Sequence, residues 1–164
     1  MRGRAFTDRK GIIVFTELYG DIVRKDIESF ISMSVQEFIN KGIVPKLAVI
    51  RAGEDSGQIY YEKAILKQSK AYGIETQAIN FTSNISQALI EVTLQAVNED
   101  DSVHGIILLR PLPKGIDGER LRVLLNPSKD VDAITDISMA ELFAGKEDAF
   151  FACTAEACME VMRY

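Results

Sequence analysis

Apolar residues recur every three or four positions over much of this chain, and this spacing predicts amphipathic helices. The longest such stretch runs from Leu18 to Lys41 and ends at Gly42. A second predicted helix runs from Gln58 to Tyr72, where Gly73 stops it. Glycine is the residue that most often follows a helix, so both ends are well marked.

A third helix is expected to follow Asn84, which with Gln87 three residues later has the pattern of a helix cap, and to continue to Val97. Its expected core face consists of Ile85, Leu89, Val92 and Ala96.

Three short apolar runs alternate with these helices and predict strands at Leu47–Arg51, Glu75–Phe81 and Gly105–Leu109. Helices of this length between strands favour parallel pairing with right-handed crossovers. The pattern therefore predicts an α/β fold, a three-layer sandwich with a mostly parallel sheet. Ligands of such sheets bind at the carboxyl ends of the strands, which here means the loops Arg51–Gly57 and Arg110–Gly118.

The remaining third of the chain has shorter stretches with a helical pattern. A helix is expected from Asp117 to Leu125, a further helical segment at Ser138–Phe143, and a final helix from about Thr154. At 164 residues, we expect residues 1–164 to form a single domain.

Composition excludes several classes of protein. The net charge is −5 and His104 is the one histidine, which argues against nucleic-acid binding, histidine triads and histidine-rich metal sites. Cys153 and Cys158 have no histidine beside them, so no metal site is expected. No apolar run reaches the roughly 18 residues that span a bilayer, and no secretion signal is recognisable, so the expected compartment is the cytoplasm.

Tyr60, Lys63 and Lys67 lie on the predicted helix that follows the first strand, close to the expected ligand edge. A partly buried lysine there is suited to acid–base chemistry, and a tyrosine can stack on a flat ring. An ordinary helix with a solvated lysine face is the competing interpretation.

Two further motifs lie at the ligand edge. Pro111-Leu112-Pro113 fixes the chain where the third strand ends, which either presents backbone groups to a ligand or simply terminates the strand. Lys129-Asp130-Val131-Asp132 brings two carboxylates into a loop, where one is suited to accept hydrogen bonds from an amino-bearing ring or to cap a turn.

Taken in order, the segments GIVPKLAVIRAGEDSGQIYYEK, VHGIILLRPLPKGID, NPSKDVDA and FFACTAEA resemble the bifunctional methylenetetrahydrofolate dehydrogenase/cyclohydrolase family. The likeness covers the folate-binding N-terminal catalytic domain of that family. It implies that Tyr60 packs on folate, that Asp132 binds the pterin, and that Leu109 and Pro111 line the substrate site.

Some positions differ from the family pattern. The family lysine of Tyr-x-x-x-Lys falls on Ala64, and Lys63 stands one residue earlier as the substitute acid–base group. The family glutamine of G-I-L-V-Q-L-P-L-P falls on Leu109, and the glycine after Asp132 is Ala133. These changes weaken the expectation of turnover more than the expectation of folate binding.

The resemblance implies a tetrahydrofolate derivative as substrate and a homodimer as the assembly. NADP is expected only with a further Rossmann domain, because no G-x-G-x-x-G follows a strand in this chain. Cyclohydrolase activity, which needs only water, is then the expected residual reaction. Two alternatives stay open: a non-catalytic folate-binding or regulatory protein, and an oligomerising interaction module built on the first and last helices.

Overall fold

Three parallel strands form the central sheet of this computed structural model, which describes residues 5–7, 13–16 and 20–163. They are β3 (Lys46–Ala52), β4 (Glu75–Phe81) and β5 (Gly105–Leu108), and their order in the sheet is β4-β3-β5. The sequence-predicted strands are thus confirmed, although β5 ends one residue earlier than predicted. β3 and β5 are largely buried, as central strands of a parallel sheet are, whereas β4 at the edge has only exposed and half-buried residues.

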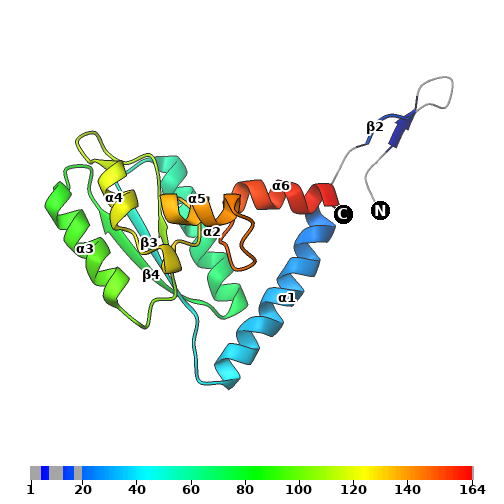
Figure 1. The fold of residues 1–164 in the computed structure, drawn as a ribbon, viewed down its shortest axis with the longest axis horizontal. Coiled ribbons are helices and arrows are strands. Elements are labelled where there is room, and N and C mark those ends of the chain that lie inside the picture. The colour runs from blue at the N-terminus through cyan, green and yellow to red at the C-terminus, as the bar shows by residue number, and fades with distance from the viewer. Residues whose placement is uncertain (1–4, 8–12, 17–19, 164) are drawn as a thin grey trace.

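Helices cover both faces of this sheet, as Figure 1 shows. On one face lie α2 (Ser56–Tyr72) and, outside it, α1 (Gly20–Asn40), while α3 (Gln87–Glu99) and α4 (Gly118–Leu124) cover the other. The arrangement confirms the layered α/β fold with a parallel sheet.

The first helix, α1, was predicted to start at Leu18, which lies outside the described residues. Within them it begins at Gly20 and ends at Asn40, close to the predicted end. The phenol of Tyr72 donates a hydrogen bond to Glu28 at 3.0 Å and so ties the end of α2 to α1. α6 (Cys153–Arg163) also contacts α1, near its amino-terminal end (Figure 1).

Shorter elements complete the fold. A 3₁₀ turn at Pro127–Lys129 and helix α5 (Asp136–Phe143) connect α4 to α6. Near the N-terminus, β1 (Ala5–Thr7) and β2 (Ile13–Thr16) pair antiparallel as a separate two-stranded sheet. The helix predicted at Ser138–Phe143 begins two residues earlier, because Thr135 caps it by accepting a hydrogen bond from the Ser138 amide.

The start and orientation of α3 differ from the prediction. The N-cap is Ser86, whose hydroxyl accepts from the Leu89 amide, and not Asn84. The face toward the sheet is Ile90, Leu94 and Val97. The predicted core residues Leu89, Val92 and Ala96 are exposed instead. Both stripes are apolar at helical spacing, so periodicity alone could not choose between them.

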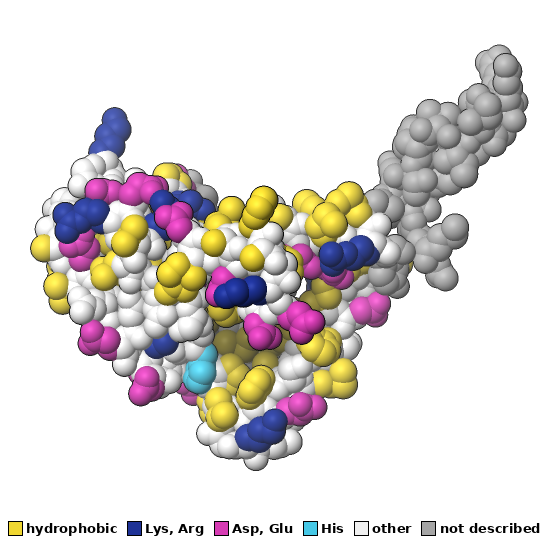
Figure 2. Space-filling view, in the orientation of Figure 1, with side chains coloured by type: hydrophobic (Ala, Val, Ile, Leu, Met, Phe, Trp, Pro, Cys, Tyr) yellow, Lys and Arg dark blue, Asp and Glu magenta, His cyan; other side chains and the backbone are white. Residues whose placement is uncertain are grey.

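The main core lies between the sheet and the α3–α4 layer. Alternate residues of β3, namely Ala48, Ile50 and Ala52, pack there against Ile90 and Leu94 of α3 and Leu121 of α4. Figure 2 shows that apolar side chains also gather at the surface over α5 and α6, on the side of the molecule where α1 lies. None of the described helices is long and apolar enough to cross a membrane.

Candidate functional site

A cavity of about 360 Å³ opens beside the carboxyl ends of the strands, and we call it the strand-end cavity. It is bounded by the start of α2, by β5 and its exit, and by the loop before α5. The lining residues are Asp55, Gly57, Gln58, Tyr61, Ile107, Leu108, Leu109, Arg110, Asp132 and Thr154. The cavity lies at the edge of the sheet where a ligand was expected.

The start of α2 forms one wall of this cavity. Asp55 caps the helix, and its carboxylate accepts a hydrogen bond from the Gln58 amide at 2.9 Å. The Gln58 side chain reaches across and donates to the carbonyl of Pro111 at 2.7 Å. This bond joins α2 to the exit of β5 and holds two walls of the cavity together.

The loop that carries Asp132 is fixed by its neighbours in the motif. Lys129 donates to the carbonyls of Asn98 and Asp100 at 2.8 and 2.7 Å and so caps the end of α3. Asp130 is fully buried, and its carboxylate accepts from the amides of Ile134 and Thr135 and from the Ser138 hydroxyl.

Val131 packs closely against Gly105 of β5. A Cβ at position 105 would lie 2.7 Å from a methyl of Val131, so only glycine allows this approach. The loop therefore lies tight against the strand, and Asp132, the next residue after Val131, lines the cavity.

The charge of Asp132 affects the pKa of two neighbouring side chains, the Tyr61 phenol and the Cys153 thiol. Burial, followed by the charge of Asp132, raises the pKa of the Tyr61 phenol. The same two causes raise the pKa of the Cys153 thiol. Both groups therefore remain protonated at neutral pH, and Tyr61 can act as a hydrogen-bond donor. Both cysteines are free, and the described residues contain no cluster suited to a metal ion.

The sequence-predicted residues fall into two groups. Leu109 and Asp132 line the strand-end cavity, and Pro111 lines an adjoining cavity of about 390 Å³ that shares Asp55 and Gln58 with it. Tyr60 and Lys63 do not line either cavity, and Tyr60 is 78% exposed. The neighbouring Tyr61 lines the strand-end cavity in its place.

Sequence reasoning did not single out Gln58 or Thr154, and it assigned the aromatic role to Tyr60. The family loop GEDPAS appears here as GEDSG, one residue shorter, and aligning QIYY with the family's Q-x-Y-V selects Tyr60. Counting from Gly53 without a gap selects Tyr61 instead. Gln58 carried a weaker signal, as a polar residue in the first turn of a helix that follows a strand.

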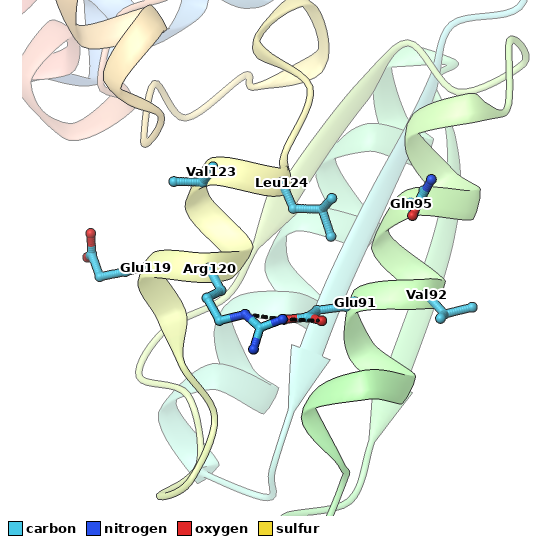
Figure 3. Close-up of a pocket in the computed structure, with 7 residues that line it drawn as sticks. All are labelled: Glu91, Val92, Gln95, Glu119, Arg120, Val123 and Leu124. Atoms are coloured by element: carbon cyan, nitrogen blue, oxygen red, sulfur yellow. Dashed lines mark hydrogen bonds and ion pairs between the residues drawn. The ribbon is translucent and has the colours of Figure 1, made fainter.

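A larger cavity of about 530 Å³ lies elsewhere, between α3 and α4. Figure 3 shows its lining residues, with Arg120 of α4 paired to Glu91 of α3 at 2.9 Å. Val92 and Val123 supply apolar surface on the two helices. None of the sequence-predicted site residues lines this cavity, so the strand-end cavity is the better candidate site.

Comparison with known proteins identifies relatives of this chain. Residues 18–132 match the family model described as tetrahydrofolate dehydrogenase/cyclohydrolase, catalytic domain. The bifunctional protein FolD of Clostridium kluyveri is 38% identical over 145 residues, which are 88% of this chain and 51% of that protein. The chain spans about half the length of the curated relatives it matches.

Solved structures agree with this match. The bifunctional FolD methylenetetrahydrofolate dehydrogenase/cyclohydrolase of Campylobacter jejuni superposes with a TM-score of 0.84 at 30% identity, over 88% of this chain and 51% of that one. The FolD enzyme of Trypanosoma brucei, complexed with NADP cofactor and inhibitor, gives 0.82 at 26% identity, over 88% and 50%. The fold of the described residues is thus that of the matching half of these enzymes.

Proposed function

The chain belongs to the tetrahydrofolate dehydrogenase/cyclohydrolase family, and from this premise we propose that residues 1–164 form one folate-binding domain that acts in one-carbon metabolism. The observation that carries the proposal is the strand-end cavity, where Tyr61, Arg110 and Asp132 meet. Its volume of about 360 Å³ is in the range of small-molecule sites. Folate supplies a group for each of these side chains.

Tyr61 offers its ring to the flat pteridine, since the residue is 56% exposed and borders the cavity. Asp132 accepts hydrogen bonds from the amino-bearing ring, as the sequence resemblance implies. The guanidinium of Arg110 is suited to a carboxylate of the folate glutamate. Tyr60, the residue expected from sequence, is placed second to Tyr61 because it lines neither cavity.

Binding is better supported than turnover. Lys63, the expected acid–base group, is exposed on α2 and is not among the residues that line the cavity. One turn after Tyr61 stand Ala64 and Ile65, which carry no amine. We propose that any cyclohydrolase activity of this domain is weak, with water as co-substrate and Asp132 and Tyr61 as the nearest groups able to exchange a proton.

The start of α2 does not fit the pyrophosphate of NADP. A pyrophosphate would need free amides at a helix start after a strand. At α2 the carboxylate of Asp55 already accepts from the Gln58 amide, and Glu54 adds a second negative charge. Hydride transfer with NADP therefore enters the proposal only with a further nucleotide-binding segment.

Calorimetric titration with tetrahydrofolate and 5-formyltetrahydrofolate tests the proposal. The unmodified protein is expected to bind, and Asp132→Ala to bind at least tenfold more weakly, since an amino group would lose its acceptor. A parallel assay of methenyltetrahydrofolate hydrolysis separates a weak enzyme from a non-catalytic binder. No binding of either compound would refute the folate proposal.

A second candidate, an interaction module, has support from the exposed apolar residues of α1 and α6. Phe30 is 67% exposed, and Met33 and Met162 are similarly uncovered. Large exposed apolar side chains on neighbouring helices are typical of surfaces that pair with another polypeptide. Mass measurement by light scattering, with and without folate, tests this candidate: a monomer under both conditions would exclude self-association, including the expected homodimer.

A further inference from the structure

Gln58 holds a buried acceptor that no described residue satisfies. The residue is 6% exposed, and its Oε1 atom has no hydrogen-bond partner among the described residues. Its Nε2 atom donates to the carbonyl oxygen of Pro111 at 2.7 Å. A carbonyl can only accept, so the amide nitrogen must face Pro111 and the oxygen must face the other way.

The free oxygen belongs to a residue that lines the proposed folate site. Gln58 borders both the strand-end cavity and the adjoining cavity at Pro111. It is the one carboxamide among the residues that line the strand-end cavity, and Leu109, which follows β5 and lines the same cavity, is apolar and 4% exposed. Buried polar atoms in native proteins nearly always have a partner, and those left without one in a cavity are suited to a ligand.

We infer that Oε1 of Gln58 accepts a hydrogen bond from an N–H group of the bound ligand, which makes Gln58 a ligand-binding residue of this site. The inference rests on the proposed function. Asp132 and Gln58 are then two acceptors, one charged and one neutral, that border the same cavity. Such a pair selects a ring rich in N–H groups, as a reduced pteridine is, over rings that offer only carbonyl oxygens.

The near-isosteric change Gln58→Met separates this role from a structural one. Methionine keeps the length of the side chain and removes both polar atoms. Pro111 is an exposed residue, so water can replace the lost amide at its carbonyl. Removing an unsatisfied acceptor also relieves its desolvation cost. We therefore expect the melting temperature without folate to be unchanged or higher, and folate affinity to fall about tenfold or more.

Two further variants sharpen the comparison. Gln58→Glu keeps an acceptor but replaces the amide that donates to the Pro111 carbonyl by a second oxygen, so it is expected to lower the melting temperature without ligand and reports the loss of that bond. Gln77 on β4 is the matched control, because its Oε1 is also buried and without a partner among the described residues, yet it does not line the strand-end cavity. Gln77→Met is expected to leave folate affinity unchanged.

The experiment is calorimetric titration of the four proteins with 5-formyltetrahydrofolate, together with their melting temperatures without ligand. Wild-type affinity in Gln58→Met would overturn the inference and leave the proposed function standing. A melting temperature of Gln58→Met lowered by roughly 5 °C or more would assign Gln58 a structural role instead. Equal losses in Gln58→Met and Gln77→Met would also overturn it. No binding by the wild-type protein would overturn both proposals.

Discussion

Arg51 of β3 and Glu62 of α2 form a buried ion pair, with 2.5 Å between Arg51 Nε and Glu62 Oε2. Glu62 is 5% exposed, and its other carboxylate oxygen accepts from Asn80 of β4 at 2.8 Å. The guanidinium also donates to the carbonyl of Gly53, in the loop that leads to α2. Two strands, one helix and one loop are thus joined by the bonds of these side chains.

Removing one partner of this pair is expected to be costly. Glu62→Ala leaves the Arg51 guanidinium buried without its counter-charge, which typically destabilises a protein by about 3–5 kcal/mol. Chemical denaturation measures the change. Glu119→Ala is the control, because the Glu119 side chain is 76% exposed in its pair with Arg122, and we expect a loss below about 1 kcal/mol. Similar losses in both variants would contradict a special role for the buried pair.

The two aspartates of the KDVD motif should respond differently. Asp130→Ala leaves two amides and a hydroxyl without their acceptor, and we expect it to lower the free energy of unfolding by about 3 kcal/mol or more. Asp132→Asn should leave stability within about 1 kcal/mol and weaken folate binding. Denaturation and titration of both variants separate the roles, and a stable Asp130→Ala protein would show that the loop is held by other contacts.

The two adjacent tyrosines provide a direct test of the site geometry. Tyr61 borders the strand-end cavity and Tyr60 does not. Tyr61→Ala should weaken folate binding about tenfold, in the range that loss of one stacked ring produces. Tyr60→Ala should bind like the unmodified protein. The reverse order of affinities would restore the interpretation made from the sequence alignment.

The raised pKa of Tyr61 predicts a pH dependence. Because the folded state holds the phenolic proton more tightly than the unfolded chain, the unfolded chain ionises first, and stability should fall as pH rises through about 10 and above. Asp132→Asn removes the second cause of the shift after burial. Ultraviolet titration of tyrosine should then show a component that moves to lower pH than in the unmodified protein. An unchanged titration curve would mean that Asp132 and Tyr61 do not interact.

Most of the fold was predictable from the sequence, because strand and helix signals alternate and helix ends are marked by glycine. Two predictions failed, and both concern which residue of a helix points inward. Helix α3 has two apolar stripes, and only tertiary packing decides that Ile90 is buried while Val92 lines the cavity between α3 and α4. The choice between Tyr60 and Tyr61 depends on one residue of loop length, which rotates a helix position by about 100°.

Gln58 illustrates a different limit. Its role as a candidate ligand contact depends on the atom it leaves free, and that follows from the position of Pro111, 53 residues away in the chain. No local pattern reports such a contact. Asp132, in contrast, was singled out from the sequence because it stands in the Lys129–Asp132 motif that carries the family resemblance.

The KDVD loop also affects how this motif should be read in other sequences. Lys129 caps α3, Asp130 ties the loop to α5, and Val131 fits against Gly105. A relative that had lost its ligand entirely would still need these three residues to fold. The first three residues of the motif therefore serve the fold, and Asp132, which lines the strand-end cavity, is the residue of the motif that bears on the proposed folate site.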